Sequence, residues 1–199
     1  MERLYITTPI YYANGPAHLG HAYTTIATDV IARWYRLKLG RDAVLFTTGM
    51  DEHGSKVQKA AAEKGMGPQE FVDGIAESFR KTWELLNISY DDFIRTSEER
   101  HKKVVKRVFR KLIDSGDIYK GIYEGWYCIP CESFWTELQL KEGKCPECGR
   151  SIEKVKEESY FFRISRYQDR LLKLYSEKPD FLLPKNRSQE IINLSLIHI

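Results

Sequence analysis

The chain has 199 residues, enough for one good-sized domain or two small ones. Hydrophobic residues make up 42% and charged residues 30%, which excludes an intrinsically disordered chain, and no apolar run approaches the roughly 20 residues of a membrane-spanning helix. The formal net charge of +3 permits nucleic acid as a partner but does not require it.

The N-terminal residues bear on where the protein works. Residues 1–10 lack a basic stretch followed by a long apolar one, so no signal peptide is predicted. The expected compartment is therefore the reducing cytoplasm, with no membrane association. In that compartment the four cysteines are not expected to form disulfides.

The first part of the chain alternates short apolar runs with amphipathic ones. The predicted elements are a strand over 4–8 that Pro9 interrupts, a helix over 21–39, a strand over 43–49, helices over 55–65 and 67–88, a strand over 90–96 and a helix over 100–116. This order predicts parallel strands with right-handed crossovers, the first half of a doubly wound, Rossmann-like α/β sheet over 1–115. Near Ile118 the helical pattern gives way to glycines, aromatics and cysteines, so a second domain is predicted over 116–193.

The last of these helices is strongly basic. Its apolar residues at helical spacing are expected to face inward; they are Val104, Val105, Val108 and Leu112. Its many Lys and Arg residues favour a solvated face over a nucleic-acid patch, because charge runs alone are weak evidence for a partner.

The turn between the first predicted strand and helix holds two histidines around a glycine. In an open α/β sheet, ligands gather at the carboxyl ends of the strands, and a helix N-terminus offers unpaired N–H groups that suit phosphate. His18 and His21 can add ring N–H donors, and Gly20 lets a flat ligand lie against the backbone. The pair could equally serve only to cap or pack the helix. The turn provides no third ligand that would favour a metal.

The four cysteines form two C-x2-C pairs with thirteen residues between them: Cys128 with Cys131, and Cys145 with Cys148. In a reducing compartment this spacing predicts a tetrahedral Zn²⁺ site in a knuckle over about 126–150. Four thiolates leave no open coordination position, so the ion is expected to be structural. Unrelated buried cysteines and a redox C-x-x-C centre are the less favoured alternatives.

Several stretches together resemble a known family. His18-Leu19-Gly20-His21 matches the HIGH motif of class I aminoacyl-tRNA synthetases. The stretches TPIYYANGPAHLGHAYTT, GMDEHG and DDFIRTSEERHKKVV, in this order, closely resemble bacterial and archaeal methionyl-tRNA synthetases, and the resemblance extends to about Asn193.

The resemblance implies a methionine–tRNA ligase of protein biosynthesis. Such an enzyme activates methionine with ATP, which it uses together with Mg²⁺, and passes it from methionyl-adenylate to tRNA(Met). In this family the histidines at positions matching His18 and His21 are catalytic, and with Gly20 they hold ATP. The zinc knuckle of the family sits in a connective insertion that splits the nucleotide-binding fold.

The resemblance also implies a methionine pocket. Tyr12 matches the family's amino-acid-binding tyrosine, and Asp51 with the backbone around Ile10 matches the groups that hold the substrate ammonium. Without the resemblance, Tyr12 would be assigned to the core and Asp51 to a turn or helix cap. The roles of Glu52 and His53 stay open.

Parts of the family pattern are missing from the sequence. There is no KMSKS loop and no helical anticodon-binding domain, and residues 194–199 depart from the pattern. The chain is therefore expected to be a truncated fragment, inactive alone, with a spurious terminus in which His198 is no site residue. The oligomeric state is not predicted. A zinc-containing nucleotide- or RNA-binding module, another adenylyl transferase and a synthetase for a different amino acid remain alternatives.

Overall fold

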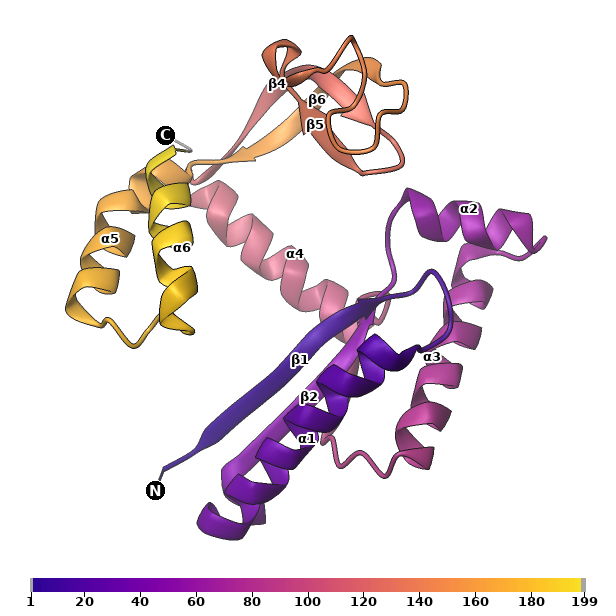
Figure 1. Cartoon of the computed structure of the whole chain (residues 1–199), viewed down its shortest axis with the longest axis vertical. Coiled ribbons are helices and arrows are strands. Elements are labelled where there is room, and N and C mark those ends of the chain that lie inside the picture. Colours follow the sequence, from indigo (N-terminus) through magenta and orange to yellow (C-terminus); the bar gives the residue numbers. More distant parts are fainter. Residues whose placement is uncertain (1, 198–199) are drawn as a thin grey trace. The chain divides into compact units, whose positions relative to one another are not determined.

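The structure is a computed structural model that describes residues 2–197, with side chains up to residue 194. His198 and residue 199 of the predicted spurious terminus lie outside the described residues. The chain divides into two compact units, the first ending at Lys106 and the second beginning at Arg107 (Figure 1). The domain limits predicted from the sequence, 1–115 and 116–193, stay a prediction.

The first unit is a parallel α/β unit. Its elements are β1 (Leu4–Tyr12), α1 (Leu19–Leu39), η1 (Arg41–Ala43), β2 (Val44–Asp51), α2 (Ser55–Glu63), α3 (Pro68–Leu85), β3 (Asp92–Arg95) and the first part of α4 (Glu99–Asp114). Both strand pairs are parallel, in the order β1-β2-β3. The alternation of strands and helices and the parallel sheet are therefore confirmed.

β1 is longer than the sequence analysis predicts. It continues through Pro9 to Tyr12, with a register shift between Thr7 and Ile10. Proline is tolerated on an edge strand and at bulges, because the N–H that it lacks is not needed there. The extension matters for the site, because it brings Tyr12 level with Asp51 of β2.

The core of the first unit lies between the sheet and α3. The apolar stripe of α3 is buried and consists of Phe71, Val72, Ile75, Phe79 and Trp83. These side chains cluster with Tyr11, Met50 and Phe93, one from each strand. The stripe thus fixes α3 against the sheet through burial of apolar surface.

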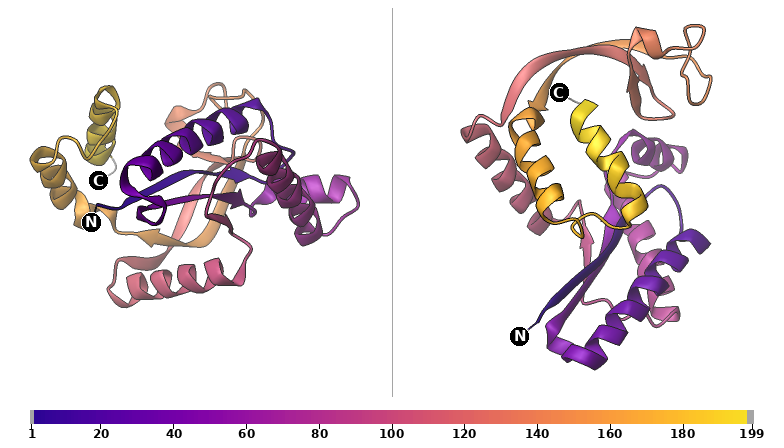
Figure 2. Two further views of the ribbon diagram at one scale, coloured as in Figure 1. Left: turned by 90° about the horizontal axis from the view of Figure 1, so that it is seen from below. Right: turned by 60° about the vertical axis from the view of Figure 1, so that its left-hand side comes forward.

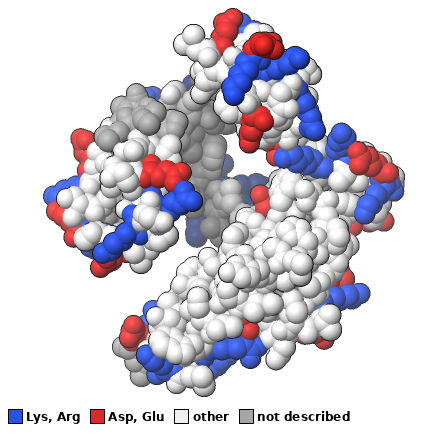
Figure 3. Space-filling view, in the orientation of Figure 1, with Lys and Arg blue, Asp and Glu red and all other residues white. Residues whose placement is uncertain are grey.

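The apolar stripes of the two other long helices are largely exposed, and for α4 this corrects the sequence analysis. No residue of α4 is buried, and Val104, Val105 and Val108 are each almost half exposed. α1 lies along β1 and β2 (Figure 2) but turns Thr25, Thr28, Asp29 and Ala32 toward the interior. Its outer side forms a broad uncharged face (Figure 3).

Polar residues can occupy the inner side of α1 because their hydrogen bonds are satisfied. Asp29 Oδ1 accepts the N–H of Ser89 at 2.8 Å, and Asp29 Oδ2 accepts a hydrogen bond from Arg33 at 2.6 Å. The hydroxyls of Thr25 and Thr28 donate to backbone carbonyls one turn earlier in the same helix. Satisfied hydrogen bonds remove most of the cost of burying these groups.

The second unit is built on an antiparallel sheet in the order β5-β4-β6. Its elements are the end of α4, β4 (Ile118–Cys128), β5 (Ser133–Trp135), η2 (Glu137–Gln139), β6 (Glu153–Phe162), η3 (Ile164–Tyr167), α5 (Gln168–Glu177) and α6 (Lys185–Ile197). β4 and β6 form a long ribbon, paired from Ile118–Phe162 to Tyr127–Glu153. Within the part of the chain that the structure describes, no helix has the length and apolar character needed to span a membrane.

Candidate active site and thiolate cluster

The two histidines of the first turn cap α1 and contact each other. His18 is the N-cap residue, and its Nδ1 accepts the N–H of Gly20 at 3.1 Å. His21 Nδ1 accepts the N–H of His18 at 3.3 Å, and the two rings stack with centroids 3.7 Å apart. Because each Nδ1 is an acceptor, each neutral ring carries its hydrogen on Nε2. The capping role is therefore compatible with two N–H donors for an anion.

Gly20 leaves room for the His18 ring in this arrangement. A Cβ at position 20 would lie 3.0 Å from Cε1 and 3.1 Å from Nδ1 of His18. Such contacts would push the His18 ring away from the N–H that it caps. Glycine is therefore the residue that lets the ring fold back over the first turn of the helix.

His21 is held in an aromatic environment. Its ring centroid lies 4.7 Å from that of Tyr11 and 5.2 Å from that of Phe79. Tyr11 is itself fixed by a 2.7 Å hydrogen bond between its hydroxyl and that of Thr25. Burial, and then the nearness of His18, lowers the pKa of His21 below 6.5. Both effects favour the neutral form of the ring.

The residues predicted to hold methionine lie at the carboxyl ends of β1 and β2. Tyr12 is the register partner of Asp51, and Ile10 that of Gly49. The N–H of Ala13 donates to the carbonyl of Asp51 at 2.9 Å, which fixes the two strand ends together. Ile10 is 43% exposed, and Tyr12 and Asp51 are half-buried. These three positions share the edge of the sheet at which ligands bind in such folds.

Gly54 makes room for the predicted pocket tyrosine. Its φ is +121°, and a Cβ there would lie 2.5 Å from the hydroxyl oxygen of Tyr12. Tyr12 also packs against the core. Tyr12 thus packs against the core and also lies at the end of its strand, where the pocket is predicted. Gly54 is a further residue of this site, and the sequence analysis did not select it.

A buried ion pair next to Asp51 was also missed. Glu52 is 4% exposed, and Arg95 donates from Nε to its Oε1 at 2.6 Å. Glu52 also accepts a hydrogen bond from the hydroxyl of Ser97, and its N–H donates to Thr96 Oγ1 at 2.8 Å. The sequence holds one signal for this pair. Glu52 and Arg95 have opposite charges, and each lies at the end of one of two strands that were predicted to be parallel.

We expect this ion pair to hold the loop after β2 in place. Arg95→Met should lower the free energy of unfolding of the chain by about 3–5 kcal/mol, because it leaves the Glu52 carboxylate buried without a cation. Arg100→Met is the matched control. The Arg100 side chain is 50% exposed and pairs with Asp92, so its loss should cost less than about 1 kcal/mol. Urea unfolding measures both, and equal losses would contradict the structural role.

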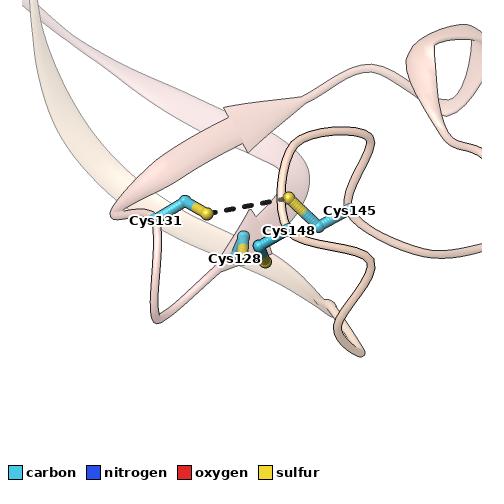
Figure 4. Close-up of side chains that lie close together, drawn as sticks. All are labelled: Cys128, Cys131, Cys145 and Cys148. Carbon is cyan, nitrogen blue, oxygen red and sulfur yellow. Dashed lines mark hydrogen bonds between the residues drawn. The ribbon is translucent and has the colours of Figure 1, made fainter.

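The four predicted zinc ligands lie together in the second unit (Figure 4). Cys128 ends β4 and Cys131 follows in the next turn, whereas Cys145 and Cys148 lie in the loop before β6. All four sulfur atoms lie within 4.8 Å of one another, with Sγ–Sγ distances of 3.5 Å for Cys128–Cys148 and 3.9 Å for Cys131–Cys145. All four thiols are free.

These distances fit a tetrahedral ion. Zn–S bonds of about 2.3 Å place the sulfurs of a tetrahedron about 3.8 Å apart, whereas a disulfide needs about 2.05 Å. The hydrogen bond with Cys148, and then burial, raises the pKa of Cys131, and burial raises that of Cys128. Burial also acts to raise the pKa of Cys145, but hydrogen bonds from the backbone of Cys148 and Glu147 lower it to about 7. Four thiolates together therefore require a cation, and the donor set suits Zn²⁺.

Comparison with known proteins places these features in a family. Residues 4–156 match the family of tRNA synthetases class I (M). The chain belongs to this family. It is 59% identical over 192 residues to the methionine–tRNA ligase of Caldanaerobacter subterraneus subsp. tengcongensis. This alignment covers 96% of the chain and 30% of the relative. It is 54% identical over 200 residues to the methionine–tRNA ligase of Bacillus subtilis, and that alignment covers 95% of the chain and 30% of the relative.

A solved structure in the family agrees with this fold. Mycobacterium tuberculosis methionyl-tRNA synthetase in complex with methionyl-adenylate superposes with a TM-score of 0.88 at 42% identity. The match covers 98% of this chain and 39% of that one. The Rossmann-like α/β fold of the class I synthetases is thereby confirmed. The chain spans about 30% of the length of the curated relatives that it matches.

Proposed function

We propose that this chain is the part of a cytoplasmic methionine–tRNA ligase that carries the HIGH motif. The complete ligase activates methionine with ATP and transfers the methionine to tRNA(Met). The observation that carries the proposal is the identity of 50% or more with methionine–tRNA ligases over 96% of the chain. In this assignment residues 1–115 are the first half of the nucleotide-binding domain, and 116–193 belong to the connective insertion with its zinc knuckle.

The turn that holds His18 and His21 is proposed to serve the first step, the formation of methionyl-adenylate. A carboxylate oxygen of methionine attacks the α-phosphorus of ATP, the bond to the β-phosphate oxygen breaks, and Mg²⁺-bound pyrophosphate leaves. Nε2–H of His18 and His21, with the N-terminal N–H groups of α1, would stabilise the negative charge on the phosphate oxygens. Gly20 leaves the backbone accessible to the nucleotide. The chemistry needs positioning and charge stabilisation but no protein nucleophile.

The strand ends are proposed to hold methionine. The Asp51 carboxylate and the carbonyl of Ile10 would accept hydrogen bonds from the ammonium group, and the ring of Tyr12 would contact the thioether. Sulfur–aromatic contacts contribute about 0.3–1.5 kcal/mol, whereas a charged pair in a dry site contributes more. Asp51 is therefore expected to dominate affinity.

The prediction for this pocket concerns Asp51→Asn. The change keeps the shape but removes the charge, so methionine binding in the complete polypeptide that carries this sequence should weaken by about 2–5 kcal/mol. Asp42→Asn in η1, an exposed position, is the control and should leave binding unchanged. Methionine titration followed by calorimetry measures both, and unchanged affinity in Asp51→Asn would remove Asp51 from the pocket.

The thiolate cluster is proposed to hold one structural Zn²⁺ through Cys128, Cys131, Cys145 and Cys148. When bound, the ion supplies folding free energy to a small module with little core of its own. The four thiolates position the turns after β4 and before β6.

The proposal as a whole is tested by ATP–pyrophosphate exchange with single amino acids. The complete polypeptide should exchange pyrophosphate with methionine and not with leucine, isoleucine or cysteine. Exchange with another amino acid would indicate a different class I synthetase. ATP binding without exchange would favour the zinc-containing nucleotide- or RNA-binding module.

A further inference from the structure

Two buried hydroxyl groups connect the end of β1 with the first turn of α1. The hydroxyl oxygen of Tyr11 lies 2.7 Å from Thr25 Oγ1, and Thr25 Oγ1 lies 2.9 Å from the backbone carbonyl oxygen of His21. Thr25 is fully buried, and Tyr11 is 6% exposed. Thr25 is also the first residue of α1 that is buried, so the pair connects the strand to the start of the helix.

The direction of these hydrogen bonds follows from the single hydrogen that each hydroxyl carries. The carbonyl of His21 can only accept, so Thr25 donates to it. Thr25 then has no hydrogen left, and Tyr11 is the donor in the bond between the two side chains. The hydroxyl oxygen of Tyr11 also lies 3.4 Å from the same carbonyl oxygen. Both hydroxyls thus converge on the backbone of His21.

The ring of Tyr11 contacts the ring of His21 as well. The two centroids are 4.7 Å apart, and the planes are tilted by 51°. Tyr11 packs in turn on Phe79 and Trp83 of α3, with centroids 5.8 Å and 6.0 Å away, and both of these side chains are fully buried. Close packing leaves such a cluster little room to rearrange. Tyr11 therefore fixes both the backbone and the ring of His21, and α3 fixes Tyr11.

Tyr11 lies next to the strand ends that are proposed to hold methionine. It precedes Tyr12 on β1, and its register partner Met50 precedes Asp51 on β2. The phosphate of ATP is proposed to be held from His21 and the start of α1. Attack needs the reacting atoms about 3–3.5 Å apart, and a misplacement of about 1 Å can cost about 10²-fold in rate. A link between the strand end and His21 therefore sets a distance on which the reaction depends.

We propose that Tyr11 and Thr25 are positioning residues that set the place of His21 relative to the end of β1. They contact neither substrate and act through His21. The inference rests on the proposed function, because that function assigns His21 to methionyl-adenylate formation. It adds two residues that the sequence analysis did not select.

The test removes one hydroxyl of this link at a time in the complete polypeptide. Tyr11→Phe keeps the ring and leaves Thr25 able to donate to His21, so no buried donor loses its acceptor. In methionine-dependent pyrophosphate exchange, Tyr11→Phe and Thr25→Val should each lower kcat by about tenfold, less than a full displacement of about 1 Å can cost. The KM values for ATP and methionine should stay unchanged, because the link serves only the approach of the reacting atoms. The double variant should be about as slow as either single variant, since both changes break the same link.

Thr28→Val is the matched control. Thr28 is also buried on the inner side of α1, and its hydroxyl also donates to a carbonyl one turn earlier, but that carbonyl belongs to Thr24. Urea unfolding should therefore show similar losses of stability in Thr28→Val and Thr25→Val, whereas kcat should fall only in Thr25→Val. An equal fall of kcat in both threonine variants would reduce the effect to helix stability and overturn the proposal. Wild-type kcat in Tyr11→Phe and Thr25→Val would overturn it as well.

A second readout does not depend on catalysis. With isotope-labelled histidine in the complete polypeptide, the NMR signal of the His21 ring should shift in Tyr11→Phe and Thr25→Val but not in Thr28→Val. An unmoved signal would show that the link does not position the ring, and would overturn the proposal. A shifted signal in a polypeptide whose unchanged form shows no methionine-dependent exchange would refute the proposed function and not the link. The two failures are therefore distinguishable.

Discussion

Cys145→Ser should reduce the zinc content of the reduced chain from one ion to nearly none. The variant keeps three thiolates, but the tetrahedron is incomplete, and a serine hydroxyl is a poor ligand because it stays protonated at neutral pH. Since the ligands must lose protons, zinc uptake by the unchanged chain should release protons and weaken at acid pH. Elemental analysis after dialysis measures the metal content, and a pH indicator measures the protons.

The loss of zinc should loosen the knuckle locally. Hydrogen exchange should rise over 126–150, whereas the helices of the first unit, which has its own core, should keep their circular dichroism. Glu147→Gln is the control, because it alters the same loop without removing a ligand. A folded, reduced preparation that holds no zinc and takes none up would defeat the metal site. Loss of zinc with unfolding of both units would instead show that the knuckle is no separate module.

His21→Ala should slow methionyl-adenylate formation by about 10²–10³, the usual effect of removing one electrostatic donor from a transition state. Methionine affinity should change little, because His21 lies in the first turn of α1 and not at the strand ends. The readout is methionine-dependent pyrophosphate exchange by the complete polypeptide. Tyr23→Ala, at a 78% exposed position of the same helix, should exchange at the unchanged rate.

A second variant separates catalysis from capping. His21 also accepts the N–H of His18, so alanine removes a cap as well as a donor. His21→Asn supplies a short polar side chain that can cap but carries no imidazole. If asparagine restores helix stability but not the exchange rate, the ring serves the transition state. Exchange at the wild-type rate in His21→Ala would show that it does not.

Elements and clusters could be predicted from the sequence where a residue pattern is compatible with only one structure. The stripe of α3 could be predicted because Phe71 and its neighbours at helical spacing meet a sheet in the same unit. The cysteine cluster could be predicted because two C-x2-C turns bring four sulfurs within reach of one ion. Neither inference needed the position of any distant residue.

Other features depend on contacts that a pattern cannot show. The stripe of α4 has the same spacing as that of α3, but Val104 and Val108 are about half exposed, since spacing shows which residues share a face but not what covers it. In α1 a charged residue is buried where the pattern would place an apolar one. Asp29 can lie on the inner side of this helix because its hydrogen bonds are satisfied. The Glu52–Arg95 pair joins residues 43 positions apart, so it appears only once the strands are aligned.

The central claim is tested most directly by charging of tRNA. The complete polypeptide, ATP, Mg²⁺ and labelled methionine are incubated with a tRNA(Met) transcript, and label in acid-precipitable RNA is counted. We predict methionine-dependent labelling of tRNA(Met) and none of a leucine tRNA transcript. Failure to label tRNA(Met) by folded, zinc-loaded protein that binds ATP would contradict the assignment.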